Sequence, residues 1–376
     1  MKCRVFLFYR KPARRPPSRI PQISYGRPSP VIRYNGEEPF PSARAPTASA
    51  AAMTQSLPGL RPDPGSDPGS LEAPRGLLLS HPVERISGKG GSHGERIETC
   101  EDAIALEEPL EIQVLYGPAE ARVTKTISIT MRTPGHDCEL AAGFLVGEGL
   151  LRSLDQLEAV AGRGPRFGPR GLRNSVQVSL RPGVPLDLKR LERNCYTTSS
   201  CGVCGKTSME ALKLNFFPVL PHAEWQARAQ VIRALPERLR EAQDIFRHTG
   251  GLHAAGLFTP EGQPIVVRED VGRHNAVDKV IGAQFLAGRE AGSILVVSGR
   301  ASFELMQKAI ASGIPMLVAV GAPSSLAVEV AEKFGATLIG FTKSNGFNIY
   351  TGAERVRFET EKRVPVGAAT AVEILP

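Results

Sequence analysis

The sequence predicts an α/β protein with a β-rich N-terminal part and a mainly parallel sheet in its C-terminal half. Two patterns support this fold class. Before about residue 200, apolar and polar residues alternate in runs typical of half-buried strands. From about residue 249, continuous apolar runs alternate with helical segments, which is typical of a sheet covered on both faces. A chain of 376 residues that is 41% hydrophobic can bury such a core.

The first 80 residues differ from the rest. They hold 14 of the 31 prolines, and 12 Lys and Arg residues against 5 Asp and Glu residues. A segment of this composition buries too little apolar surface to offset the entropy lost on ordering. We therefore expect residues 1–90 to be a disordered extension or a misassigned start, with Met53 as an alternative first residue. Because most of the +8 charge lies there, the basic pI predicts no nucleic-acid partner.

Residues 95–360 are predicted to form the body, with a β-rich part at 95–200 and an alternating part at 249–360. In the first part, residues 110–116 and 123–131 alternate in polarity around a Gly-Pro turn, which predicts two paired strands. The remaining expected elements are a helix over 139–151, a loop over 161–171, a strand over 175–180, and helices over 206–216 and 225–246. We expect Pro236 to break the last of these.

In the alternating part, each apolar run is followed by a polar, glycine-rich loop. The expected strands are 265–267, 294–297, 316–320 and 338–341, and the expected helices are 275–286, 302–311 and 324–334. Ligands of such sheets bind beyond the carboxyl ends of the strands. We therefore expect four loops to share one edge, namely residues 268–275, 298–302, 321–325 and 342–348.

Two thiols lie in the Ser/Thr/Gly-rich segment 197–206. Cys201 and Cys204 are three positions apart, Gly202 and Gly205 relax the local backbone, and Lys206 follows. A nearby ammonium favours the thiolate, which is the nucleophilic form of cysteine. This pattern favours a nucleophilic or sulfur-carrying cysteine.

Metal binding and redox chemistry are alternatives for the same thiols. A structural zinc site needs four ligands, and the usual second CxxC or His pair is missing, although Cys195 and a distant His253 or His274 remain candidates. A thioredoxin-like CxxC would follow a strand and open a helix, whereas this one lies in a loop. Zinc deaminases carry H-x-E, but Ala255 occupies the glutamate position after His253, which excludes that acid/base chemistry.

The predicted strand ends also carry cations and helix starts. Arg273 and His274 follow a strand at the position where an anionic ligand would lie, and Arg300 and Lys343 follow two others. Serines that open helices fit both simple capping and phosphate binding. Together these residues favour a large phosphate-bearing ligand.

Several stretches resemble the formate dehydrogenase accessory sulfurtransferase family (FdhD/NarQ). They are TPGHDCELAAGFLVGEG (133–149), SSCGVCGK (199–206), TGGLHAAGLF (249–258), REDVGRHNAVDKVIG (268–282), SGRASFELMQKA (298–309), GAPSSLAVE (321–329) and GFTKSNGFNIY (340–350). The resemblance spans roughly residues 95–360.

The resemblance implies a sulfur carrier that takes persulfide sulfur from a cysteine desulfurase. It implies delivery to the molybdenum cofactor in its bis(molybdopterin guanine dinucleotide) form, as required for formate dehydrogenase activity. Cys201 would carry the persulfide and Cys204 would assist. The implied cofactor-binding residues are Phe341, Thr342, Lys343, Ser344, Asn345 and Gly346.

The resemblance also implies a cytidine deaminase-like core, a homodimer and a cytoplasmic location. The cofactor is then a bound substrate, and we expect neither a permanent cofactor nor a metal ligand set. No apolar run is long enough to span a bilayer, so we expect no membrane partner. Two alternatives stay open, a zinc-binding protein and a non-catalytic chaperone of the molybdenum cofactor.

Overall fold

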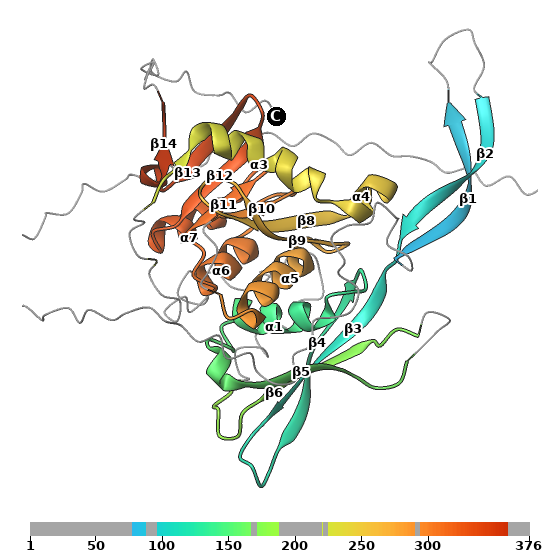
Figure 1. The fold of residues 1–376 in the computed structure, drawn as a ribbon, viewed down its shortest axis with the longest axis vertical. Coiled ribbons are helices and arrows are strands. Elements are labelled where there is room, and N and C mark those ends of the chain that lie inside the picture. The colour runs from blue at the N-terminus through green and yellow to red at the C-terminus, as the bar shows by residue number, and fades with distance from the viewer. Residues whose placement is uncertain are drawn as a thin grey trace, which may run out of the picture. The chain divides into compact units, whose positions relative to one another are not determined.

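The computed structural model describes residues 77–87, 96–166, 171–187, 220, 225–289 and 294–359, all within one compact unit, Ser56–Pro376. Cys201 and Cys204, the expected helix over 206–216 and residues 1–76 lie outside this description. The described elements form two main sheets with a layer of helices between them (Figure 1).

The larger sheet belongs to the C-terminal half. It consists of β8 (His253–Phe258), β9 (Pro264–Asp270), β10 (Ile294–Val297), β11 (Met316–Ala319), β12 (Thr337–Lys343) and β13 (Gly346–Thr351), in the order β13-β12-β11-β10-β8-β9. Strand β11 pairs in parallel with β10 and β12, whereas β10–β8, β8–β9 and β12–β13 are antiparallel. The expectation of a mainly parallel sheet is therefore wrong, and the sheet is mixed. Two connections, 259–263 and 344–345, are short turns, and such turns join antiparallel strands.

The directions of the strands nevertheless agree with the prediction that four strand ends share one edge of the sheet. Because β8 runs antiparallel to both β9 and β10, β9 points the same way as β10, β11 and β12. The carboxyl ends of these four strands therefore lie at one edge of the sheet, as the sequence predicts. The first residue of β8, His253, lies at the same edge.

Helices cover both faces of this sheet. One face packs against α5 (Arg273–Leu286), α6 (Phe303–Ala311) and α7 (Ser325–Lys333), which confirms the three predicted helices. The other face packs against α3 (Ala229–Glu241), with α4 (Asp244–Thr249) following it. The predicted break at Pro236 is wrong, because α3 continues through it. Its buried apolar face offsets the hydrogen bond that proline removes.

The N-terminal part is β-rich, as the sequence predicts. A four-stranded sheet has the order β4-β3-β6-β5 and contains β3 (Glu108–Tyr116), β4 (Val123–Arg132), β5 (Leu157–Arg163) and β6 (Ser175–Leu180). Strands β1 (Leu78–Ser87) and β2 (Arg96–Ala105) form a separate antiparallel ribbon, which the sequence analysis missed together with β5 and β13. The short strands β7 (Ala227–Arg228) and β14 (Val356–Arg357) pair in parallel.

Helix α1 (Asp137–Gly147) joins the two halves of the core by crossing α5. A Cβ added at Gly143 would lie 1.8 Å from the Asp278 carbonyl oxygen, and one at Gly282 would lie 1.8 Å from the Glu139 carbonyl oxygen. The two backbones touch there because neither glycine has a side chain. The helix ends at Gly147, and Gly149, with a φ of 71°, completes the Schellman turn that follows it.

Candidate functional site

The shared edge is a rigid platform, because its loops hydrogen-bond to one another. The amide of Gly321 donates to the Gly299 carbonyl at 2.9 Å, and the amide of Phe341 donates to the Gly321 carbonyl at 3.0 Å. Ala301 and Pro323 form a further bridge between the same loops. Helices α5, α6 and α7 all begin at this edge, so their N-termini face the space beyond it.

A buried polar network links the end of β9 to α5, next to the shared edge. The Lys279 ammonium lies 2.7 Å from an Asp270 carboxylate oxygen and donates to the Thr133 carbonyl at 2.8 Å. The same carboxylate accepts hydrogen bonds from the Gly272 amide and the Asn275 side chain, at 2.8 Å and 3.0 Å. Each of these polar groups has a hydrogen-bond or ion-pair partner, so the network holds the start of α5 in place against the end of β9.

His253 lies on the platform beside the loop that follows β10. A Cβ added at Gly299 would lie 3.6 Å from the imidazole Nδ1, so the ring packs directly over that glycine. Burial, and then the charge of Arg273, lower the pKa of His253 below its ordinary value, against the opposing influence of Asp270. The imidazole is therefore neutral at neutral pH.

Arg273 and His274 form the first turn of α5. Burial lowers the pKa of His274 to about 4, assisted by the positive charges of Lys308 and Arg273. The nearest carboxylate, Glu304 on α6, lies 4.0 Å from the imidazole Nε2, beyond hydrogen-bonding distance. His253, Arg273 and His274 are thus mutual neighbours at the sheet edge.

Four buried polar atoms at this edge have no hydrogen-bond partner within the described part of the chain. They are Arg273 Nε, His274 Nε2, Ser302 Oγ and Thr342 Oγ1. Ser302 opens α6 without capping it, whereas Ser324 at the start of α7 accepts a hydrogen bond from the Ala327 amide at 3.3 Å. Buried polar groups are normally satisfied, so this concentration indicates a place where a polar ligand binds.

The segment implied to bind the cofactor, residues 341–346, lies at the same edge and comprises the end of β12, the turn 344–345 and the first residue of β13. Phe341 is exposed and has a φ of 53°, which is unusual for a residue with a side chain. Thr342 is buried, while Lys343, Ser344 and Asn345 are exposed. The structure thus brings this segment together with His253, Arg273, His274 and the loop around Arg300.

Comparison with known proteins agrees with this picture. The profile of the FdhD/NarQ family matches residues 105–357. A protein named sulfur carrier protein FdhD from Streptomyces avermitilis is 47% identical over 271 residues, covering 69% of this chain and 91% of the relative. One of the same name from Sulfurisphaera tokodaii is 43% identical over 258 residues, covering 68% and 92%. The chain belongs to the FdhD/NarQ family.

A solved structure has a similar fold. The crystal structure of a putative formate dehydrogenase accessory protein from Desulfotalea psychrophila matches with a TM-score of 0.53 and 22% identity. The match covers 74% of this chain and all of the other. The cytidine deaminase-like core stays a prediction.

Within the FdhD/NarQ match lie charged pairs whose importance the sequence did not reveal. Lys308 on α6 is buried and lies 2.8 Å from Asp278 on α5 and 3.3 Å from Glu148. Arg268 makes two hydrogen bonds to Glu139, at 2.6 Å and 2.8 Å. The signal in the sequence was the presence of charged residues within otherwise apolar helices and strands, because such residues need buried partners.

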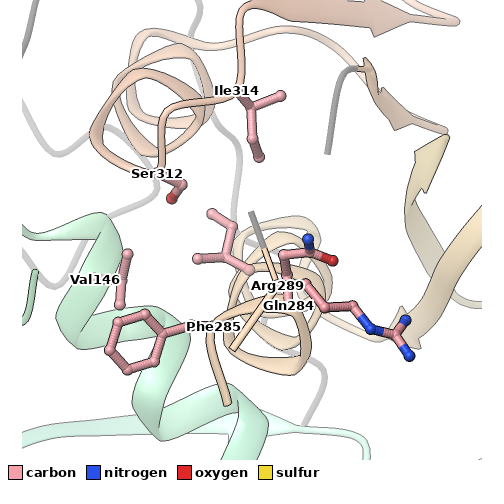
Figure 2. A pocket seen from close by; sticks show the side chains of 7 residues that line it. Val146, Gln284, Phe285, Arg289, Ser312 and Ile314 are labelled. Atoms are coloured by element: carbon pink, nitrogen blue, oxygen red, sulfur yellow. The ribbon is translucent and has the colours of Figure 1, made fainter. Parts of the chain in front are cut away.

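A small cavity of about 70 Å³ lies at the other end of α5, away from the candidate site (Figure 2). Val146, Phe285, Arg289, Ser312 and Ile314 are among its lining residues. It is too small for a dinucleotide and holds no member of the expected site, so it does not compete with the sheet edge.

The described residues contain no group of three or more His, Cys, Asp or Glu side chains placed to hold a metal ion. None of their helices combines the length and apolar character that crossing a membrane requires.

Proposed function

We propose that this chain is a sulfur carrier that delivers sulfur to the molybdenum cofactor for formate dehydrogenase. Its membership of the FdhD/NarQ family and the name that its curated relatives share support this proposal. The observation that carries the proposal in the structure is the set of four unpartnered polar atoms at the sheet edge. They fit a large ligand rich in phosphate and carbonyl oxygens, which the bis(molybdopterin guanine dinucleotide) form of the cofactor provides as substrate.

Cys201 is the proposed carrier. Its thiolate attacks the outer sulfur of the desulfurase persulfide, so that a new S–S bond forms on Cys201. The S–S bond of the donor breaks, and its cysteine leaves as a thiolate. In the sequence, glycines flank this cysteine pair and relax the local backbone, and the cation of Lys206 favours the thiolate form of cysteine. Cys204 is proposed to assist in passing the sulfur on.

The cofactor is proposed to bind across the sheet edge, with residues 341–346 among its contacts. The exposed Phe341 ring offers a flat apolar surface on which a guanine base can stack. Lys343 adds a cation beside it. The cysteine desulfurase and formate dehydrogenase are the proposed partners, and a homodimer in the cytoplasm is part of the same proposal.

Sulfur labelling tests this proposal. The full chain is incubated with a cysteine desulfurase and ³⁵S-cysteine, and protein-bound label is measured before and after reduction. We expect reducible label on the wild type and on Cys100→Ala and Cys138→Ala, whose cysteines lie outside the 201–204 pair. Cys201→Ala should lose the label. Equal labelling of Cys201→Ala would exclude Cys201 as the carrier, and stoichiometric zinc with no label would favour the zinc-binding alternative.

A further inference from the structure

A groove of about 540 Å³ runs along β13, beside α3. Four consecutive residues of the strand, Gly346–Ile349, line it, together with Ala229 and Arg233 of α3 and Phe358 after β14. Figure 1 shows α3, β13 and β14 in the same part of the molecule. Neighbouring residues of a strand point to opposite faces of a sheet, so contact with four in succession places the groove against the backbone edge of β13.

Within the described chain, one backbone edge of β13 is unpaired. The strand pairs only with β12, because it is the terminal strand of the order β13-β12-β11-β10-β8-β9. The amides and carbonyls on the other edge of such a strand can pair with an added strand. Residues that usually block this pairing, proline and lysine, are absent from Gly346–Thr351.

Apolar side chains border the same edge. Phe358 is 44% exposed although it is a large aromatic residue. Phe347 and Ile349 are half-buried and pack against the core cluster beneath α3. A strand laid against β13 would cover the remaining apolar surface of these three side chains, which is favourable in water. The groove therefore suits a polypeptide that carries apolar side chains.

The arginines at the groove indicate the charge of this polypeptide. Arg233 is a lining residue, and Arg228 and Arg357 each precede a lining residue. Arg228 and Arg357 are also register partners in the β7–β14 pairing, so two like charges lie on neighbouring strands. All three arginines are exposed. Carboxylates from a partner would relieve the repulsion between them.

The carboxylates of this region leave the arginines available. Glu354 pairs with the buried Arg355 at 3.2 Å. Glu237, one turn beyond Arg233 on α3, and Glu359, next to Phe358, are exposed and form no ion pair within the described ranges. An inorganic anion would use the arginines alone, whereas a polypeptide would also use the strand edge.

We propose that the groove along β13 binds an extended, acidic and apolar segment of a partner protein, which joins the sheet as an added strand. The backbone edge of β13 pairs with the segment, Phe358 contacts its apolar side chains, and Arg233 attracts its carboxylates. A segment in which acidic and apolar residues alternate presents the two kinds on opposite faces. The proposal does not rest on the proposed function, because none of its arguments uses Cys201 or the molybdenum cofactor.

Fluorescence anisotropy of the full chain with a designed peptide tests the proposal. The probe is a labelled peptide in which glutamate alternates with isoleucine, phenylalanine and valine. The matched probe has lysine in place of every glutamate. The wild type should bind the acidic peptide with a dissociation constant below about 1 mM and the basic peptide roughly tenfold more weakly. Added salt should weaken binding of the acidic peptide.

Variants of the groove locate the bound peptide. Arg233→Glu should bind the acidic peptide roughly fivefold or more weakly, and it should bind the basic peptide more tightly than the wild type does. Phe358→Ala should bind the acidic peptide roughly fivefold more weakly through lost apolar contact.

The matched control is Arg240→Glu, which changes an exposed arginine two turns beyond Arg233 on α3 and outside the groove. It should bind the acidic peptide within about twofold of the wild type. The three variants should keep the wild-type unfolding midpoint, because all three side chains are exposed.

Backbone methylation distinguishes an added strand from charge attraction alone. Two further acidic peptides carry N-methyl groups on alternate residues, one on the odd positions and the other on the even positions. An added strand pairs with β13 through one of its edges, so one methylated peptide should lose binding and the other should keep it. Equal effects of the two methylation patterns would refute strand addition.

Other results would also overturn the proposal. They are no binding of the acidic peptide by the wild type at about 1 mM, and unchanged binding by folded Arg233→Glu and Phe358→Ala. Self-association of the wild type that Arg233→Glu abolishes would assign the groove to a second copy of this chain. Tighter binding of the peptide by Ile374→Asp than by the wild type would assign it to residues 360–376 of the chain itself.

Discussion

At the scale of single residues, two serines that look alike in the sequence differ in what they contact. Ser324 accepts a hydrogen bond from Ala327 and caps α7, whereas Ser302 caps nothing and its hydroxyl is buried without a partner in the part of the chain that the structure describes. Ser324→Ala should lower the free energy of unfolding by about 1 kcal/mol through the lost cap. Ser302→Ala should leave it nearly unchanged. Urea denaturation of both variants checks this, and an equal loss in both would contradict the assigned roles.

A second prediction at the residue scale concerns Glu139 and the pH dependence of the protein's stability. Burial alone would raise its pKa, but the hydrogen bonds from Arg268 and His136 outweigh burial and lower the pKa from 4.5 to about 2. Because the folded-state pKa lies below the unfolded value, the pair stabilises the fold above about pH 4.5, and this stability is lost as the pH falls towards 2.

Arg268→Leu should therefore cost about 3 kcal/mol of unfolding free energy at neutral pH. The difference from wild type should shrink between about pH 4.5 and pH 2 as Glu139 becomes protonated in the wild type. Chemical denaturation as a function of pH measures this. The control is Arg240→Leu, an exposed arginine on α3, which should show little effect at any pH. A pH-independent difference for Arg268→Leu would argue against the ion pair as its cause.

At the scale of elements, the crossing of α1 and α5 holds the two sheets on one core. Gly143→Ala would place its methyl group 1.8 Å from the Asp278 carbonyl, on backbone that cannot rotate away. We expect a loss of about 3 kcal/mol or more, or failure to fold. Gly251→Ala is the control, because its added methyl would meet atoms no nearer than 3.8 Å. Thermal unfolding distinguishes them, and a stable Gly143→Ala would show that the helices can separate at low cost.

Element positions follow from the sequence where periodicity is strong. The helices α5, α6 and α7 and the strand β10 are confirmed within a residue or two, because each combines apolar runs with a clear start or stop. The ribbon β1–β2 could not be predicted in this way, since most of its residues are exposed on both faces and show no alternation. Strand β13 was obscured by the polar turn before it. The predicted strands also lacked β8, and the three antiparallel pairings of the sheet all involve β8 or β13, so the prediction of a mainly parallel sheet was wrong.

At the scale of the whole molecule, the sequence predicts the location of the candidate site better than it predicts the side-chain contacts within the site. Strand ends sharing an edge follow from chain topology, so Arg273 and residues 342–346 lie at one edge of the sheet as expected, and His253 lies at the same edge at the start of β8. The unpartnered hydroxyl of Ser302 and the buried Lys308–Asp278 pair depend on side-chain packing between α5 and α6. No local pattern encodes such packing, because it arises between segments distant in the chain. Cys201 and Cys204 lie outside the described residues, so their role remains a prediction.

The most direct test of the account is activation of formate dehydrogenase by variants of this chain. Inactive dehydrogenase, cofactor, cysteine desulfurase and cysteine are combined with purified wild type, Cys201→Ser or Cys138→Ser, and formate oxidation is measured. The account predicts activation by the wild type and by Cys138→Ser, and none by Cys201→Ser even when that variant binds the cofactor normally. Full activation by Cys201→Ser would contradict a sulfur carrier and favour a non-catalytic cofactor chaperone.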